Sequence, residues 1–311
     1  MEALLQVILP VFLVLGGGYA AARAGLFGDG LVDGVMRFAQ TFALPCLLFR
    51  GVVRLDLATA FDPALIGAFY AGVIVAFLAA AATAMRVFGR TLPDAIAIGF
   101  AAAFSNTLLL GLPITERAYG ADALSANYAI IAVHAPILYL LGITAMEWAQ
   151  ARGRGLSALR VSGLVGRGLV HQPLIIGIAG GLAVNLSGLP VPGVAWEALG
   201  MLAGAAIPAA LFGLGGVLSR YRSEGDRATI AMVCGVSLIL HPAVTYGLGL
   251  AFGLPVEALR SAVITAAMAP GVNAYLFAHI YGVAMRVSAS AVLYGTAACL
   301  ASAWVWLQLL P

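Results

Sequence analysis

Two short groups of polar, proline and glycine residues interrupt long apolar stretches of the sequence. The first group contains Ser105, Asn106, Thr107, Gly111 and Pro113, and the second contains Pro270, Gly271, Asn273 and Tyr275. Because proline removes a backbone donor and glycine weakens a helix, each group predicts an interrupted helix. Where a helix restarts, its free N–H groups and positive dipole end form a site for a carboxylate. Amide and hydroxyl side chains beside that site would hydrogen-bond an anion without carrying charge themselves.

A simpler interpretation is that these prolines and glycines only kink packed helices, and that the asparagines cap them. An interrupted helix in a membrane leaves backbone groups that lipid cannot satisfy, so such a segment is tolerated where it lines a protein cavity. Paired interruptions in two similar apolar stretches favour the binding-site interpretation. We therefore expect Asn106 and Asn273 to contact a bound anion.

Titratable groups inside the apolar stretches are few. The acidic residues of these stretches lie near their ends: Asp94, Glu116, Asp122 and Glu147. The middle of each stretch therefore offers no carboxylate that stands out as a sodium ligand. His134 and His241 each lie near a proline, and an imidazole with a near-neutral pKa can carry a coupled proton. The alternative for each histidine is a packing role in the core.

Several function classes are excluded by what the sequence lacks. All sixteen basic residues are arginine, so there is no Walker A lysine to bind nucleotide phosphates. The sequence contains no H-E-x-x-H, G-x-S-x-G or C-x-x-C motif, and it has no clustered basic face for nucleic acid. We expect no enzyme activity, no cofactor, no metal site and no nucleic-acid partner.

The elements that position these residues are membrane-spanning helices. Hydrophobic residues form 62% of the 311 residues, and charged residues form only 9%. In soluble domains roughly 25% of residues are charged. A span needs about 20 apolar residues. Ten stretches meet that length: 3–22, 34–53, 63–85, 93–115, 123–147, 169–188, 194–218, 228–252, 259–281 and 287–310. The fold class expected is an all-α membrane protein with ten spans, of which spans 4 and 9 are the interrupted ones.

Arginine placement predicts the orientation of these spans. With the N-terminus outside, twelve arginines fall in inner segments and four in outer segments. The positive-inside rule therefore predicts that both termini lie on the outer side. The arginine-rich segment 151–168 would be a cytoplasmic linker between two halves, residues 1–150 and 169–311.

The two halves carry a weak internal repeat. Residues 43–49 (Ala-Leu-Pro-Cys-Leu-Leu-Phe) match residues 206–212 (Ala-Ile-Pro-Ala-Ala-Leu-Phe) at an offset of 163, and Tyr119-Gly120 matches Tyr281-Gly282 at an offset of 162. Because each half has five spans, the second half would enter the membrane in the opposite orientation. Such inverted repeats are common in secondary transporters, which bind substrate at the repeat interface near the midplane.

These segments resemble the auxin efflux carrier family, which includes plant PIN-type auxin exporters and bacterial carriers of malonate and malate. The matching pieces are residues 44–49, 105–113 and 269–281, and the similarity covers nearly the whole chain. The resemblance implies a fold like that of bile acid sodium symporters, in which broken helices 4 and 9 cross. Spans 1, 2, 6 and 7 would form a scaffold, and spans 3–5 and 8–10 would form a mobile transport domain.

The resemblance also implies roles for individual residues. The substrate contacts would be Ser105, Asn106, Thr107, Gly271, Asn273 and Tyr275. The residues that shape the crossing of the two helices would be Gly111, Pro113 and Pro270. The scaffold residues that face the site would be Pro45, Cys46 and Pro208. We expect a homodimer in the cytoplasmic membrane of a bacterium that moves a small organic anion by an elevator mechanism. The alternatives are a proton- or sodium-coupled symporter of another solute, and a membrane sensor without transport.

Overall fold

The structure is a computed structural model that describes residues 4–150, 172–221, 224 and 226–311, and its regular secondary structure in these residues is helical apart from one isolated β-bridge. The expected linker 151–168 and the first residues of the expected span 169–188 lie outside the described part. The helices group into two compact units, each assembled from segments far apart in sequence.

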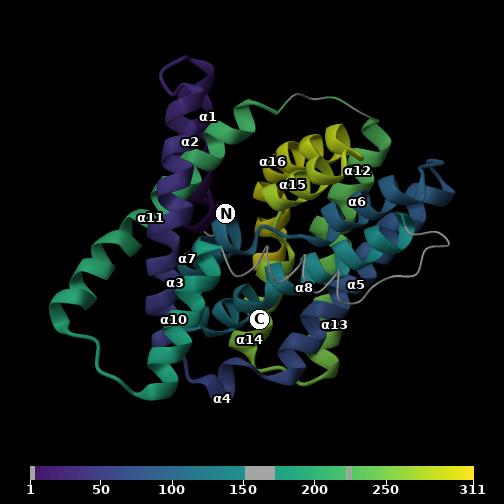
Figure 1. Cartoon of the computed structure of the whole chain (residues 1–311). Helices are drawn as coiled ribbons and strands as arrows, with labels where there is room; N and C mark the ends of the chain where they lie inside the picture. Colours follow the sequence, from purple (N-terminus) through teal and green to yellow (C-terminus); the bar gives the residue numbers. More distant parts are fainter. Residues whose placement is uncertain (1–3, 151–171, 222–223, 225) are drawn as a thin grey trace. The chain divides into compact units, whose positions relative to one another are not determined.

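The larger unit takes helices from both halves of the chain (Figure 1). Its α-helices are α5 (Pro63–Arg86), α6 (Leu92–Ala103), α7 (Leu112–Tyr119), α8 (Leu124–Gln150), α12 (Arg227–Gly235), α13 (His241–Ala251), α14 (Val256–Ala266), α15 (Val272–Tyr281) and α16 (Met285–Leu309). Short turns complete it: π-helical η1 (Leu4–Ile8), η3 (Thr107–Gly111) and η5 (Val236–Leu240), and the 3₁₀ turn η4 (Ala121–Ala123).

The smaller unit also combines early and late segments of the chain. It contains α1 (Leu9–Arg23), α2 (Asp29–Phe38), the π-helical turn η2 (Ala39–Ala43), α3 (Leu44–Val53), α4 (Leu57–Ala60), α10 (Pro173–Ser187) and α11 (Gly193–Ser219). Helix α1 packs along α11, and α3 packs along α10. The two halves predicted from sequence, 1–150 and 169–311, cut across both units and remain a prediction.

Seven helical runs in the described residues are long and apolar enough to cross a membrane. They are Gln6–Arg23, Asp29–Val53, Pro63–Arg86, Leu124–Gln150, Gly193–Ser219, Arg227–Ala251 and Met285–Leu309. Each coincides with one of the spans expected from sequence. The other three expected spans contain shorter helices: α6 and α7, α10, and α14 and α15. The chain is thus an all-helical, multi-pass membrane protein.

Glycine allows close approach between helices in both units. In the larger unit, a Cβ on Gly72 of α5 would lie 2.5 Å from Thr245 Oγ1 of α13. In the smaller unit, Gly18 of α1 lies directly against the Phe212 carbonyl of α11, and a Cβ on Gly177 of α10 would lie 2.5 Å from the Pro45 carbonyl oxygen. Small residues at helix contacts are typical of membrane proteins, where backbones pack closely without a hydrophobic driving force.

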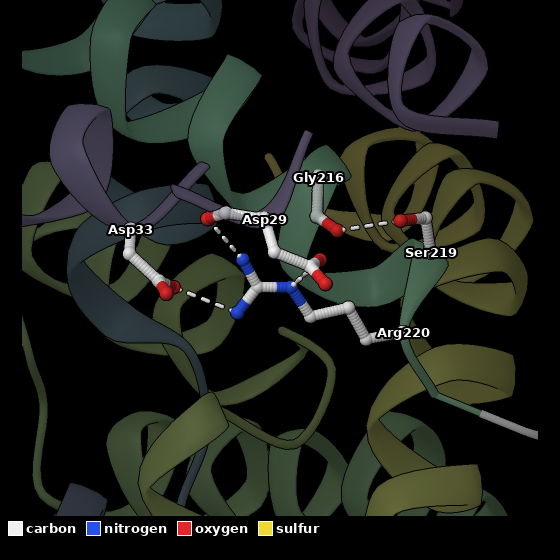
Figure 2. A network of polar contacts seen from close by, with 5 residues as sticks. All are labelled: Asp29, Asp33, Gly216, Ser219 and Arg220. Carbon is white, nitrogen blue, oxygen red and sulfur yellow. Dashed lines mark hydrogen bonds and ion pairs between the residues drawn. The ribbon is translucent and has the colours of Figure 1, made fainter. Parts of the chain in front are cut away.

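Polar residues define the ends of several helices. Asp62 caps α5 by accepting from Ala64 N at 2.8 Å, and Asp226 caps α12 by accepting from Ala228 N at 3.0 Å. At the C-terminal end of α11, Arg220 binds the N-terminal turn of α2 (Figure 2): it donates to Asp33 Oδ1 and to the Asp29 carbonyl, both at 2.7 Å, and its Nε lies 2.9 Å from Asp29 Oδ1. Arg220 thereby ties α11 to α2 within the smaller unit.

Candidate binding site at two interrupted helices

The first interruption separates α6 from α7. Helix α6 ends at Ala103, and the next three residues are not helical. Asn106 then caps the following turn, since its Oδ1 accepts from Leu109 N at 3.3 Å. Pro113 follows the π-helical turn η3 directly, at the second residue of α7, so it lies within the helical segment that starts after Asn106. The sequence therefore stops one helix and starts another inside a single apolar stretch.

The second interruption separates α14 from α15. Helix α14 ends at Ala266, and α15 begins at Val272 with Gly271 as its N-cap residue. Gly271 has no side chain to accept from the first turn, and α15 has no side-chain cap hydrogen bond. The first N–H groups of a helix have no helical partner four residues earlier. Ala274 N donates to the Gly271 carbonyl at 2.9 Å, and the N–H groups of Val272 and Asn273, which make no backbone hydrogen bond among the described residues, remain available to a ligand.

The two interruptions pair with each other through their backbones. Asn106 N donates to the Ala269 carbonyl at 2.8 Å, and Gly271 N donates to the Phe104 carbonyl at 2.8 Å. These bonds flank an antiparallel bridge between Ser105 and Pro270. In this pattern the two residues of the bridge need no N–H of their own, so Pro270 is accommodated without losing a bond. We call this paired segment, residues 104–107 and 267–273, the crossover.

Residues from neighbouring helices support the crossover. The Ser237 hydroxyl in η5 donates to the Met268 carbonyl at 3.2 Å. On α16, a Cβ at Gly295 would lie 2.8 Å from Pro270 Cδ, so only glycine fits there without movement. Gly111 also packs closely on this segment, since a Cβ there would lie 3.4 Å from Met268 Cγ. Sequence reasoning missed Ser237 and Gly295, since neither belongs to a motif.

A buried polar network beside the crossover was also missed. Asn127 of α8 donates to Thr265 Oγ1 of α14 at 2.6 Å and to Thr115 Oγ1 of α7 at 3.3 Å. All three side chains are completely buried. The network joins one helix that follows the first interruption to one that precedes the second. Asn127, a polar residue near the start of span 5, was the available signal.

The predicted site residues differ in how they are buried and paired. Ser105 is 1% exposed and Asn106 is 7% exposed, and neither Ser105 Oγ nor Asn106 Nδ2 has a hydrogen-bond partner. Buried polar groups are nearly always paired, so two unpaired groups side by side indicate a ligand or water. Thr107 is buried beside them, and Asn273 is half-buried in the first turn of α15. The ring of Tyr275, also half-buried, packs against Tyr221 at 5.0 Å and stacks on His279 at 5.8 Å.

The electrostatics of the crossover come from dipoles. The buried polar side chains of the described chain are serine, threonine, asparagine and histidine, with no carboxylate or arginine among them. The helical segment η3–α7 and helix α15 begin at the crossover with their positive dipole ends, whereas α6 and α14 end there with their negative dipole ends, so an anion would lie at the two starting ends. Among the described residues, no three histidine, cysteine, aspartate or glutamate side chains form a group that could hold a metal ion. This arrangement is suited to an anion that accepts hydrogen bonds.

His134 and His241 lie in the core of the same unit. Their rings both contact Phe69, at centroid distances of 5.7 and 5.2 Å. His134 additionally makes an edge-to-face contact with Phe104, at 4.8 Å, and so reaches the crossover.

The three residues expected to face the site from the scaffold belong to the smaller unit. Pro45 and Cys46 lie half-buried in the first turn of α3, and Pro208 is exposed within α11. Their approach to the crossover remains a prediction.

Comparison with known proteins identifies the family. The sequence matches the family described as "Membrane transport protein" over residues 3–307, nearly the whole chain. The chain belongs to this family. The resemblance to auxin efflux carriers is thereby confirmed, and the protein is a membrane transporter and not an enzyme.

Relatives of this transporter come from archaea and bacteria. It is 28% identical to an "Uncharacterized transporter" of Methanothermobacter thermautotrophicus, over 86% of this chain and 87% of the relative. It is 26% identical to a "Putative malonate transporter" of Rhizobium meliloti, over 95% of this chain and 92% of the relative. It is 24% identical to the "Uncharacterized transporter YfdV" of Escherichia coli, over 96% and 95% of the two chains.

Proposed function

We propose that the protein carries a small organic anion, such as malonate or another dicarboxylate, across the cytoplasmic membrane. The observation that carries the proposal is the crossover, where two interrupted helices are joined by two backbone hydrogen bonds of 2.8 Å. Two helical segments begin there, and unpaired neutral groups on Ser105 and Asn106 lie beside them. A carboxylate at this position would accept hydrogen bonds from both the side chains and the helix N-termini.

The proposed architecture is ten spans in two inverted repeats, residues 1–150 and 169–311. Two observations support this architecture. Short segments of the two halves match each other at offsets of 163 and 162 residues, and one interruption from each half pairs with the other. In a membrane, non-helical backbone is tolerated where protein satisfies it. At the crossover each interruption satisfies part of the backbone of the other.

The proposed mechanism is elevator-type alternating access. The smaller unit contains α1, α2, α3, α10 and α11, which correspond to the expected scaffold spans 1, 2, 6 and 7. The larger unit contains the crossover and the remaining spans. A compact unit that holds the whole crossover would carry the anion as one body, so its separate packing supports this mechanism.

The choice of a dicarboxylate rests on chemistry and on one relative. The site has no fixed cation, so it would bind an anion whose charge is spread over several acceptor oxygens. The Rhizobium meliloti relative, which is named for malonate, is 26% identical to this chain. Malonate is therefore the first substrate to test.

Counterflow of radiolabelled malonate into malonate-loaded proteoliposomes tests the function. We expect uptake by the wild-type protein and none by protein-free vesicles. Asn106→Ala and Asn273→Ala should each abolish it, because each removes an amide from the proposed site. A purified wild-type protein that binds malonate without counterflow would indicate a sensor, and unchanged transport by both variants would overturn the site.

A further inference from the structure

His134 lies in α8 against the crossover. Its side chain is 2% exposed, and its ring contacts Phe104 edge-on at 4.8 Å and Phe69 at 5.7 Å. The imidazole lies beside the Ser105 backbone, yet neither ring nitrogen makes a hydrogen bond of ordinary geometry. A buried imidazole has one donor and one acceptor to satisfy, so two unpaired nitrogens next to a binding segment indicate a role beyond packing.

His241 provides an internal comparison. It is also completely buried, and both of its ring nitrogens are unpaired. Its ring contacts Phe69 at 5.2 Å, whereas the ring contact with Phe104 of the crossover is made by His134. Of the two histidines, His134 is therefore the one placed to respond to an anion at the crossover.

Few other titratable groups face His134. Tyr70 of α5 lies at a ring distance of 6.2 Å, and its hydroxyl donates to the Ile130 carbonyl at 3.1 Å. Tyr139, on α8 itself, packs on Phe104 at 5.9 Å. His241 lies on the same Phe69 ring as His134, and no carboxylate or arginine is among the buried side chains of the described residues. A proton on His134 would thus have no permanent counter-charge.

We infer that His134 binds a proton that travels with the anion, so that the carrier is a proton–anion symporter. This inference rests on the proposed function. A buried imidazolium without a partner is costly, and a carboxylate at the crossover offsets that cost. Anion binding therefore favours protonation of His134, and by reciprocity protonation strengthens anion binding. The larger unit holds both sites, so one movement would carry both.

Malonate uptake with and without a proton gradient tests this coupling in proteoliposomes of the full-length protein. With the membrane potential clamped and the outside made more acidic, we expect wild-type uptake to rise at least about 5-fold, the lower range of coupling between sites. His134→Gln keeps the size and polarity of the side chain but binds no proton. Its counterflow should be reduced but measurable, and its uptake should not respond to the gradient. His241→Gln is the matched control and should keep the wild-type response.

A second measurement needs no variant. At a pH where malonate is fully ionised, its addition to wild-type proteoliposomes should acidify an internal pyranine indicator. Wild-type counterflow without acidification and without a gradient response would overturn the coupling and leave the proposed function standing. A gradient response that survives His134→Gln would overturn the assignment to His134. Absence of any wild-type counterflow would overturn the proposed function and the coupling with it.

Discussion

Asn106 uses the two ends of its amide for different purposes. Its Oδ1 caps the turn after the first interruption through Leu109 N, while its Nδ2 is buried and has no partner. Capping alone does not require asparagine, because aspartate, serine or threonine would cap this turn about equally well. The unpaired amide donor is what suggests a ligand.

Asn106→Asp separates these two purposes. Aspartate is as good an N-cap as asparagine, and the two helix N-termini at the crossover offset the cost of burying its charge, so thermal stability in detergent should stay within about 1 kcal/mol of wild type. The variant loses a donor and adds a negative charge, so malonate transport should fall at least about 10-fold, the effect of losing one hydrogen bond to a charged group. Asn106→Ala is the comparison, because it should lose both stability and transport. Wild-type transport by Asn106→Asp would show that the amide donates nothing to the substrate.

At the scale of helices, the crossover depends on what packs against it. Pro270 rests on Gly295 of α16, where a Cβ would lie 2.8 Å from Pro270 Cδ and 3.6 Å from Cys234 Sγ. Gly295→Ala should therefore destabilise the protein by about 1–3 kcal/mol through overpacking.

Gly247→Ala is the matched control for Gly295→Ala. Gly247 lies within helix α13, and a Cβ there would meet nothing within 4 Å. This substitution should be neutral or stabilise by about 0.4–1 kcal/mol, since alanine restricts the unfolded chain. Thermal unfolding of both variants in one detergent provides the measurement. Equal stability of the two would mean that Pro270 is not held against α16.

Helices α6 and α14 end close to the proline, glycine and asparagine residues that the sequence singles out, because these residues act on the local backbone. Their supports could not be predicted in the same way. Ser237 supports the crossover by its hydrogen bond to the Met268 carbonyl, and Gly295 by leaving room for the Pro270 ring. Both contacts depend on tertiary packing, which the local sequence does not reveal. The membrane helices followed from composition alone. The sequence treated His134 and His241 as equivalent, whereas the structure distinguishes them through Phe104.

At the scale of the whole molecule, arginine distribution predicts the orientation in the membrane. Twelve of the sixteen basic residues fall on one side of the expected spans. Arg220, with its bonds to Asp29 and Asp33, lies in that set (Figure 2). Arg90 and Arg286, which form ion pairs with Asp226 and Glu224, belong to the same predicted set. The positive-inside rule predicts that this side faces the cytoplasm.

Reporter fusions check this orientation. Alkaline phosphatase fused after Pro311 should be active and green fluorescent protein fused there should be dark, because the C-terminus is expected outside. Fusions after Gln150, at the end of α8, should give the reverse result. Fluorescence of the C-terminal fusion would show that the chain has the opposite orientation or an odd number of spans.

The central claim is that an anion binds at the N–H groups of two helices that begin at the crossover. Hydrogen–deuterium exchange of the purified protein, with and without malonate, measures those groups directly. We predict that malonate slows exchange in peptides covering residues 104–110 and 270–275, and that the uncharged analogue malonamide does not. Protection confined to other peptides, with both crossover peptides exchanging as in the free protein, would contradict the account.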